Sequence, residues 1–313
     1  MSELPLVSIL MPAFNAEKFI AEAIQSIVQQ DHPNWELLIL NDASTDGTAE
    51  KIASFHDPRI NVFEHQENLG YLLSCNELFE NAKGEFVTFL DADDTCASNR
   101  ISACLAAFET DVELQFVTTD HIRTDEFGKV ISENRTEIDY KRYASEPNYY
   151  PTICCATIFL KKEQLQKVGG YHPFFKDIGG EDYHWLFRLS RAGKGNHLPE
   201  SVYTYRQHSG QTHLQNQNPL KYFAKDIDQE IRSDLILGND KLNDPESLKQ
   251  KWIAYSNKEQ AELHFRKASE ALNQGRNGAF LLLLGKGLLS NPLRLKNIRR
   301  TVYLAYSRAA RIA

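Results

Sequence analysis

The sequence lacks the features that mark membrane, secreted or disulfide-rich proteins. No apolar run reaches the roughly 18 residues that a helix needs to cross a bilayer. The first residues, Met1 to Pro5, do not have the basic and then apolar layout of a signal peptide. The five cysteines, an odd number, have neither the density of a disulfide scaffold nor the spacing of zinc ligands. We therefore expect a cytoplasmic protein whose cysteines are buried as small apolar side chains.

Acidic residues are missing from the last part of the chain. Residues 276–313 contain eight Lys or Arg and no Asp or Glu, although the formal net charge of the whole chain is −7. The part before residue 276 is therefore strongly acidic, which argues against binding to nucleic acid. A composition of 42% hydrophobic and 25% charged residues in a chain of 313 is that of a globular protein with one large domain, or a domain and an appendage.

The first half of the chain alternates strand and helix signals at short intervals, as parallel α/β folds do. Apolar and β-branched runs predict strands over residues 7–11, 35–40, 60–64, 85–90, 114–123 and 152–160. Amphipathic segments predict helices over residues 16–29, 48–55, 71–82, 97–109 and 181–191. Asn15 is the expected cap of the first helix. The pattern predicts an α/β fold with a mostly parallel central sheet flanked by helices.

The signal becomes helical from about Pro219 to the end. Residues 261–273 and 279–289 predict a helical hairpin that turns at Gly275 and Gly278. We therefore predict one domain over residues 1–218 and a helical region over residues 219–313.

Three carboxylates, Asp91, Asp93 and Asp94, follow directly after the predicted strand at residues 85–90. Like charges this close repel one another unless a cation lies among them, so the cluster favours a divalent-metal site. A solvated turn or a helix cap is the alternative, because a lone Asp-x-Asp is a weak motif. The carboxyl end of a buried parallel strand favours the metal site, since open α/β sheets bind ligands there. Asp94 fits a turn or cap better than it fits the chemistry.

Two further polar clusters, Met11–Asn15 and Asn41–Gly47, also follow predicted buried strands. Each could be turn chemistry alone, because Asn, Asp, Ser and Gly are the standard turn formers. Together with the three carboxylates they place polar groups on one rim of one sheet. That layout predicts a nucleotide pocket.

The second half of the chain contributes two more groups of candidates. Glu181 and Asp182 follow two glycines at a helix start, where a favourable pairing with the helix dipole would explain either residue alone. Arg206 and His208 offer a cation and an imidazole, which suit a phosphate contact and a metal ligand. Trp185 suits an acceptor contact or the core equally well.

The ordered set of these segments resembles the family 2 glycosyltransferases, inverting enzymes of the GT-A fold that use nucleotide-sugar donors. The matching segments occur in the family's order and spacing and cover about the first 215 residues. They are Val7–Asn15, Leu40–Thr48, Asn68–Gly70, Lys83–Phe86, Leu90–Asp94, Gly169–Tyr171 and Glu181–Asp182. The resemblance implies the Rossmann-like GT-A fold, here with a helical C-terminal extension.

The resemblance also implies roles for individual residues. Its implied donor-binding residues are Pro12, Phe14, Asn15, Asp42, Asn68, Asp91, Ala92 and Arg206. Of these, Asp42 would accept a hydrogen bond from a uracil-type imide. The implied ligands of Mn²⁺ or Mg²⁺ at the donor diphosphate are Asp91, Asp93 and His208, with Asp93 the direct ligand. Cys75 stands where family members often have a basic residue, which leaves Arg206 or Arg100 to contact the pyrophosphate.

For the reaction itself, the resemblance implies that Asp182 is the general base and that Glu181 orients the acceptor or the base. A sugar hydroxyl is a poor nucleophile, so a carboxylate must take its proton during attack on the anomeric carbon. The leaving nucleoside diphosphate needs a Lewis acid, which the metal supplies. We expect transfer from a nucleotide sugar, a UDP-sugar first, to a glycan or glycoconjugate in surface polysaccharide biosynthesis. The alternative is a non-catalytic nucleotide-sugar or glycan-binding module on the same fold.

The basic C-terminal segment allows two interpretations. After Pro292, apolar residues recur at spacings of three and four, and the basic residues lie mostly off that stripe. The segment is either a terminal helix packed on the domain or a surface helix on the anionic inner face of the membrane, near a lipid-linked acceptor. Liposome flotation with and without residues 291–313 distinguishes them, and equal flotation would contradict the peripheral membrane contact.

Overall fold

The computed structural model describes residues 4–211, 220, 223–273, 281–284 and 286 of the chain. The chain forms two compact units. The first unit consists of Met1–Gln217 and Ala224–Asn239, and the second of Asn218–Phe223 and Asp240–Ala313. The helix that begins at Ala224 therefore belongs to the first unit. The domain boundary expected after residue 218 stays a prediction.

Four parallel strands form the first half of the sheet, in the order β3-β2-β1-β4. They are β1 (Val7–Ala13), β2 (Trp35–Asn41), β3 (Ile60–Glu64) and β4 (Phe86–Phe89). Helices connect them in chain order, namely α1 (Ile20–Val28), α2 (Thr48–Ala53) and α3 (Tyr71–Asn81). Every residue of β1, β2 and β4 is buried, which explains why their sequences are nearly continuous apolar runs.

The second half of the sheet mixes strand directions. It continues from β4 through β8 (Phe159–Lys161), β6 (Leu114–Thr124), β9 (Lys194–Arg206) and β5 (Thr95–Cys96), and β7 (Val130–Asn134) pairs with β6. Strand β8 is antiparallel to both neighbours, whereas β9 runs parallel to β6. Strand β5 comes directly after the predicted carboxylate cluster and pairs with the end of β9. The pairing ties two segments that are far apart in the sequence.

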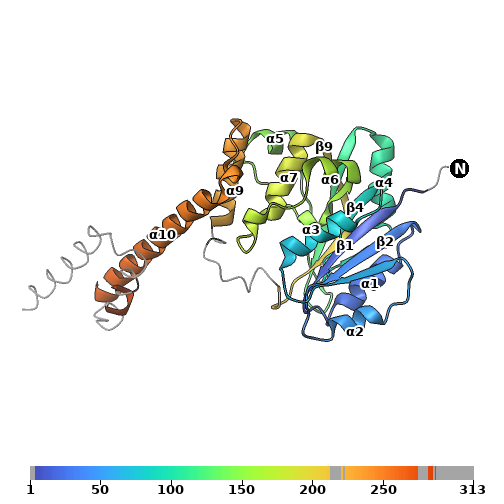
Figure 1. Cartoon of the computed structure of the whole chain (residues 1–313), viewed down its shortest axis with the longest axis horizontal. Coiled ribbons are helices and arrows are strands. Elements are labelled where there is room, and N and C mark those ends of the chain that lie inside the picture. The colour runs from blue at the N-terminus through green and yellow to red at the C-terminus, as the bar shows by residue number, and fades with distance from the viewer. Residues whose placement is uncertain (1–3, 212–219, 221–222, 274–280, 285, 287–313) are drawn as a thin grey trace, which may run out of the picture. The chain divides into compact units, whose positions relative to one another are not determined.

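Helices cover both faces of the sheet, as predicted (Figure 1). Apolar side chains of α1, α2 and α4 (Arg100–Thr110) form one core cluster with alternate residues of β1, such as Ile9. Helix α3 packs on the other face, over β1 and β2. Helix α7 (Glu181–Ala192) is contacted by three other helices of the first unit, α5 (Tyr140–Ser145), α6 (Lys162–Val168) and α9 (Ala224–Ile236). The parallel strands β1, β2 and β4 end at one edge of the sheet.

The prediction that Asn15 caps the first helix is wrong. Helix α1 begins at Ile20, with Phe19 in the cap position. Asn15 has a φ of +50°, which places it in a left-handed turn rather than at a helix start. The Ala16 N–H, one residue on, donates to Thr48 Oγ1 at 2.8 Å. The chain between β1 and α1 is therefore held by the loop after β2, and local capping does not start the helix.

The strand predicted over residues 152–160 is also shorter than expected. A 3₁₀ turn, Cys155–Thr157, occupies its middle, and only Phe159–Lys161 pairs as β8. Thr157 Oγ1 donates to the Cys154 carbonyl at 2.8 Å and accepts the Thr119 N–H at 3.2 Å. The first bond closes the turn locally and the second links it to β6, and together they favour the turn over continued strand pairing.

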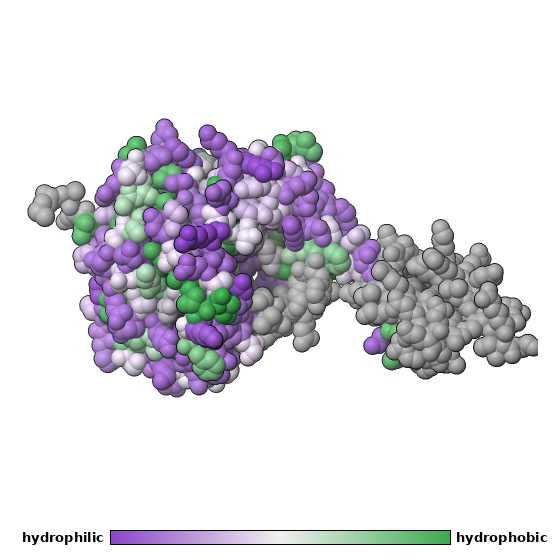
Figure 2. Space-filling view, turned by 180° about the vertical axis from the view of Figure 1, so that it is seen from behind, coloured by the Kyte–Doolittle hydropathy of each residue, from purple (hydrophilic) through white to green (hydrophobic). Residues whose placement is uncertain are grey.

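The second unit is helical where it is described. Helix α10 (Pro245–Asn273) follows a 3₁₀ turn at Lys241–Asn243 and begins well before the helix predicted from residue 261. Residues 281–284 and 286 are also helical. The predicted turn at Gly275 and Gly278 and the basic segment 291–313 lie outside the described residues. In the part of the chain that the structure describes, no helix is long and apolar enough to cross a bilayer. Figure 2 shows a mostly hydrophilic face whose apolar residues form small separate patches.

Candidate active site

The loops after β1 and β2 are locked together at the carboxyl edge of the sheet. The Asn15 N–H donates to Ser44 Oγ at 3.0 Å, and Asn15 Oδ1 accepts the Thr45 N–H at 2.8 Å. Pro12 is buried within β1, while the Phe14 side chain is 49% exposed at the rim. The structure therefore brings the predicted residues of these two loops to one place, with Phe14 accessible to a ligand.

Asp42, directly after β2, holds the loop that follows β3. Its Oδ1 accepts the Leu69 N–H at 2.8 Å and lies 2.6 Å from His65 Nδ1, and its Oδ2 accepts the Gly70 N–H at 2.8 Å. Asp42 is only 3% exposed, so its carboxylate faces this loop. Asn68, next to Leu69, is exposed. The hydrogen bond from Asp42 to a uracil stays a prediction.

The carboxylates that follow β4 point to different partners. Asp91 Oδ1 accepts the Tyr71 hydroxyl at 3.1 Å. Asp94 is 1% exposed and accepts the Tyr203 hydroxyl and the Arg206 N–H, each at 2.7 Å. The Asp94 N–H donates to the Asp91 carbonyl at 3.0 Å and closes the turn. Asp94 therefore serves the turn, as its sequence position suggested, and leaves Asp91 and Asp93 as the candidates for chemistry.

Asp93 is partly exposed and pairs with His208. Asp93 Oδ2 lies 2.9 Å from His208 Nε2, and the Asp93 side chain is 28% exposed. The pair joins the turn after β4 to the segment after β9. Asp93 and His208 are therefore in contact at one corner of the sheet, in the turn that also contains Asp91, and the role of the three as metal ligands stays a prediction. Ala92, between the two aspartates, is buried.

The Arg206 side chain also contacts the turn after β4. Its Nε donates to the Asp93 carbonyl at 3.0 Å, its Nη1 to the Glu126 carbonyl at 3.2 Å, and its Nη2 lies 2.6 Å from Glu22 Oε2. The side chain is 8% exposed, and the guanidinium lies over the Phe19 ring. Its nitrogens are thus taken by acceptors of the protein itself. The phosphate contact expected for Arg206 stays a prediction.

Arg100, the other candidate for the pyrophosphate, lies beneath the end of β4. It is 1% exposed, and its guanidinium donates to the Phe89 carbonyl at 2.7 Å and to Thr88 Oγ1 at 2.8 Å. The cation also lowers the pKa of Asp91, against the larger effect of burial. Arg100 therefore holds the end of β4 from within the core and favours the charged form of Asp91.

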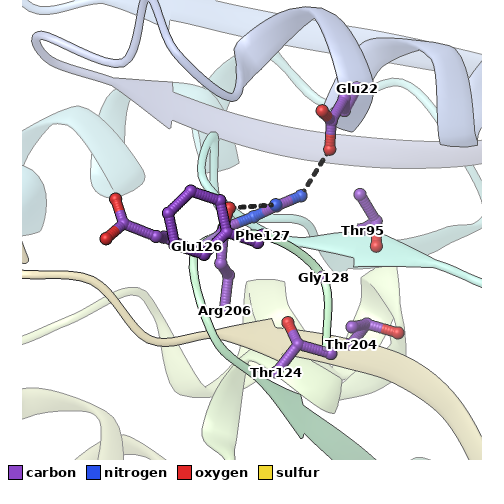
Figure 3. A pocket seen from close by; sticks show the side chains of 8 residues that line it. All are labelled: Glu22, Thr95, Thr124, Glu126, Phe127, Gly128, Thr204 and Arg206. Carbon is purple, nitrogen blue, oxygen red and sulfur yellow. Dashed lines mark hydrogen bonds and ion pairs between the residues drawn. The ribbon is translucent and has the colours of Figure 1, made fainter. Parts of the chain in front are cut away.

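A polar pocket of about 450 Å³ borders Arg206 (Figure 3). Its lining residues are Glu22, Thr95, Thr124, Glu126, Phe127, Gly128, Thr204 and Arg206. Figure 3 shows the Arg206 guanidinium reaching toward Glu22, with the threonine side chains grouped on the other side. None of the carboxylates predicted for catalysis lines this pocket.

Two glycines set the entry to α7. Gly179 and Gly180 have φ angles of +88° and +89°, in the region that glycine tolerates and other residues rarely adopt. The turn places Glu181 and Asp182 in the first turn of the helix. The Tyr183 N–H donates to Asp182 Oδ1 at 2.7 Å. Burial raises the pKa of Asp182, against the smaller lowering effects of this bond and of the Cys155 thiol. The helix start thus presents two adjacent carboxyls.

An aromatic cluster connects α7 with β4. The rings of Phe79, Phe89, Tyr171 and Trp185 have centroids between 5.2 and 6.2 Å apart. Trp185 is 1% exposed, and its Nε1 donates to the Gly169 carbonyl at 2.8 Å. The structure therefore places Trp185 in the core. Because Phe89 precedes Asp91 and Trp185 follows Asp182, the cluster fixes the two acidic groups relative to each other.

Burial raises the pKa values of these carboxyls. Burial, followed by the charge of Asp93, raises the pKa of Asp91 to about 7. Burial, followed by the charge of Asp182, raises the pKa of Glu181 to about 8. The pKa of Asp182 is raised as well, mainly by burial, and its charge adds to the shift at Asp91. Acidic groups of the turn after β4 and of the start of α7 therefore disfavour one another's charged forms.

Four residues of the site were not predicted, namely His65, Tyr71, Cys155 and Tyr203. His65 directly follows β3, so the rule that ligands bind at carboxyl ends of strands could have found it. Tyr203 links both ends of the carboxylate turn, because its hydroxyl accepts the Asp91 N–H at 3.4 Å and donates to Asp94. No local pattern marks Tyr203 or Cys155, because both meet their partners only through the fold.

The donor set of this corner fits a divalent cation. Asp91, Asp93 and His208 offer carboxylate oxygens and an imidazole, which are ligands of Mn²⁺, and carboxylates also suit Mg²⁺. Within the described ranges, no three His, Cys, Asp or Glu side chains converge closely enough to hold a metal alone. A cation at this corner would therefore need further ligands from a bound molecule, as the diphosphate of a donor can provide.

The comparison with known sequences identifies the family. A family model described as "Glycosyl transferase family 2" matches residues 8–169. The Bacillus subtilis protein named putative glycosyltransferase EpsE is 29% identical over 209 residues, 66% of this chain and 74% of the relative. The Escherichia coli protein WfgD, named UDP-Glc:alpha-D-GlcNAc-diphosphoundecaprenol beta-1,3-glucosyltransferase, is 30% identical over 185 residues, 58% of this chain and 68% of the relative. These relatives do not favour the alternative of a non-catalytic module.

Solved structures share the fold. TarS of S. aureus, residues 1–349 in complex with UDP-GlcNAc, superposes with a TM-score of 0.57 at 18% identity and covers 97% of this chain and 87% of its own. The mannosyltransferase PcManGT of Pyrobaculum calidifontis, in complex with GDP-Man and Mn²⁺, gives a TM-score of 0.54 at 19% identity and covers 99% and 87%. Both are similar to this chain in fold alone, and they confirm the predicted glycosyltransferase fold.

The raised pKa values predict that the metal-free protein becomes less stable as the pH rises from about 5 to 8. The folded protein keeps protons on Glu181 and Asp91 that the unfolded chain, with ordinary values of 4.5 and 3.8, has already released. Unfolding therefore releases protons, so a higher pH favours the unfolded state. Thermal unfolding across this range should show the melting temperature falling by a few degrees.

Two variants check the cause of this slope. Glu181→Gln should flatten the profile, whereas Glu50→Gln, on the exposed surface of α2, should leave it unchanged. A Glu181→Gln profile parallel to that of the wild type would show that the raised pKa of Glu181 is not the cause.

Proposed function

Because the chain belongs to glycosyl transferase family 2, we propose that it transfers a sugar from a UDP-sugar to a glycan or glycoconjugate acceptor, with inversion at the anomeric carbon. One observation carries the proposal, namely that an aromatic contact joins the strand before Asp91 to the helix that begins with Glu181 and Asp182. The rings of Phe89 on β4 and Trp185 on α7 have centroids 6.0 Å apart, so the acidic groups of the two elements share one edge of the sheet. The corner of Asp91 suits the diphosphate of a donor, and Asp182 suits the hydroxyl of an acceptor.

The donor nucleotide is proposed to lie along the loops after β1, β2 and β3. Phe14 and Asn68 are exposed there and would contact the base and ribose, with Pro12 and Asn15 shaping the loop beneath. Asp42 would act by holding the loop of Asn68. The donor in the name of WfgD, UDP-Glc, supports uridine.

Asp93 and His208, with Asp91, are the residues that would hold Mn²⁺ or Mg²⁺. The Mn²⁺ in the complex of the Pyrobaculum mannosyltransferase supports this assignment. The cation supplies Lewis-acid stabilisation of the negative charge that develops on the diphosphate. Arg206 keeps the backbone of Asp93 and Ala92 in place, so we assign it a positioning role rather than a direct phosphate contact.

Asp182 is proposed to act as the general base. As the acceptor oxygen forms its bond to the anomeric carbon, the bond from that carbon to the diphosphate oxygen breaks, and the hydroxyl proton passes to the Asp182 carboxylate. The nucleoside diphosphate leaves with the bonding electron pair. Attack from the face opposite the leaving group inverts the anomeric centre. Glu181, beside the base, would orient the acceptor hydroxyl.

The proposed acceptor is a lipid-linked glycan of surface polysaccharide biosynthesis. The name of WfgD includes an acceptor sugar on diphosphoundecaprenol, which supports a glycan carried on a lipid. An acceptor of this kind lies at a membrane surface, so the enzyme would work beside a membrane. The contact with that membrane through residues 291–313 stays a prediction.

The donor assignment predicts that UDP binding depends on Mn²⁺ and on Asp93. Isothermal titration calorimetry with Mn²⁺ present should show UDP binding to the wild type, and Asp93→Asn should weaken it by roughly 10–100-fold, the usual cost of disturbing a metal site. Asp57→Asn is the matched control, because Asp57 precedes β3 at the opposite edge of the sheet. Wild-type protein that binds no UDP with Mn²⁺ and hydrolyses no UDP-sugar would overturn the assignment, and parallel titrations with GDP and dTDP would identify another nucleotide.

The general-base assignment predicts that Asp182→Asn loses transfer and keeps donor binding. The amide cannot accept the hydroxyl proton, so kcat should fall by about 10²–10⁴-fold. The dissociation constant for UDP, measured by the same titration, should stay within a factor of about two, because the side chain acts on the acceptor. An Asp182→Asn variant with full transfer activity would show that another group is the base.

A further inference from the structure

Helix α9 buries an ion pair against the helix that carries the proposed base. Asp228 and Arg232 lie one turn apart on α9, with Arg232 Nη2 2.7 Å from Asp228 Oδ2, and their side chains are 1% and 0% exposed. Taking two charges out of water costs free energy that their mutual attraction often does not recover. A pair this deeply buried is therefore poorly explained as a stabilising contact alone. It lies outside residues 8–169, which match the family.

The cation of this pair holds the first turn of α7. Arg232 Nη2 donates to the Tyr183 carbonyl at 3.0 Å and to the Tyr143 hydroxyl at 2.6 Å. The Tyr143 hydroxyl in turn donates to the same Tyr183 carbonyl at 3.0 Å. Tyr183 directly follows Asp182, so these bonds fix the backbone on which the proposed base stands.

The anion of the pair reaches the next residue of α7. Asp228 Oδ1 lies 3.3 Å from His184 Nδ1, and its Oδ2 accepts the Tyr150 hydroxyl at 2.6 Å. The charge of Asp228 also raises the pKa of Asp182, after the larger effect of burial. Asp228 therefore acts on the base through contacts with α7 and through its charge.

Arginine suits this place better than lysine does. The guanidinium of Arg232 lies against the rings of Tyr143, Tyr150 and Phe187, with centroid distances of 4.5, 4.4 and 5.0 Å. Its Nε and Nη1 have no hydrogen-bond partner among the described residues, so these rings are what they face. A planar cation fits between aromatic rings, whereas an ammonium group is compact and strongly hydrated.

We propose that Asp228 and Arg232 of α9 are positioning residues of the transfer reaction, which fix the first turn of α7 and set the charge around Asp182. The inference rests on the proposed function, because it takes Asp182 as the base. It makes α9, which follows the part of the chain that resembles the family, a component of the catalytic unit. The other ionisable groups that act on or lie beside Asp182 are Glu181, Tyr183 and His184 on α7, Cys154 and Cys155 before β8, Asp91 after β4, and Tyr171 before α7.

Opposite charge changes in the pair provide the test. Asp228→Asn removes a negative charge near Asp182, so the acid limb of the pH profile of kcat/KM should move to lower pH. Arg232→Gln removes a positive charge, so the limb should move to higher pH. Each shift should be about one pH unit, as expected for a unit charge at roughly 10 Å with the effective dielectric constant of about 20 that suits proteins. Both variants should lower kcat and leave UDP binding unchanged.

Two controls separate this role from a merely structural one. Arg232→Lys keeps the charge but loses the aromatic fit, so it should lower the melting temperature without moving the limb. Glu36→Gln disturbs a buried carboxylate at the start of β2, at the opposite edge of the sheet, and should also destabilise the protein without moving the limb. Shifts in the same direction for Asp228→Asn and Arg232→Gln, or no shift in either, would overturn the proposal.

Two further measurements keep the test decisive. If a charge variant does not fold, Tyr143→Phe removes one hydrogen bond to the Tyr183 carbonyl and leaves both charges. That variant should lower kcat severalfold at constant UDP affinity, and an unchanged kcat would contradict the positioning role. If the wild type transfers no sugar, the proposed function fails, and titration of the Asp182 carboxyl by ¹³C NMR in the same variants still decides whether the pair sets its charge.

Discussion

Repulsion among carboxylates at one edge of the sheet is the constraint on which the arrangement of this protein depends. The turn after β4 and the start of α7 bring acidic groups together where burial already disfavours their charged forms, which raises the pKa values of Asp91 and Glu181. Anything that brings positive charge to such a site stabilises it. A divalent cation at the donor diphosphate and a proton taken from an acceptor both do this, so the unfavourable electrostatics of the free protein suit the proposed reaction.

The fold holds the acidic groups together with contacts from distant segments. On one side, Tyr203 and Arg206 at the end of β9 grip the turn after β4 through Asp94 and the Asp93 backbone. On the other side, an aromatic cluster joins β4 to α7. From within the core, the Arg100 guanidinium donates to the Phe89 carbonyl and lowers the pKa of Asp91 against the larger effect of burial.

Much of this could be predicted because parallel strands buried on both faces leave a continuous apolar sequence. The strand at residues 60–64 was predicted with the bounds that the structure has. The place of Asp91 and Asp93 followed from the rule that ligands bind at the carboxyl ends of strands. Only the family resemblance associated His208 with them, and the structure brings His208 into contact with Asp93. The cap at Asn15 and the middle of the strand over residues 152–160 were wrong because side chains replace backbone partners there. The Ser44 hydroxyl accepts the Asn15 N–H, and the Thr157 hydroxyl accepts the Thr119 N–H of β6.

The sequence by itself determined the alternation of strands and helices and the edge at which the acidic residues gather, because both depend on local pattern and strand direction. Only the tertiary structure decided which partners those residues meet. In the structure, Arg206 binds Glu22 and the Asp93 backbone, and Asp42 accepts hydrogen bonds from the loop after β3. The Asp228–Arg232 pair of α9 contacts the backbone next to Asp182. Buried charges pair with groups from distant segments, and the spacing of residues along the chain does not predict which groups these are.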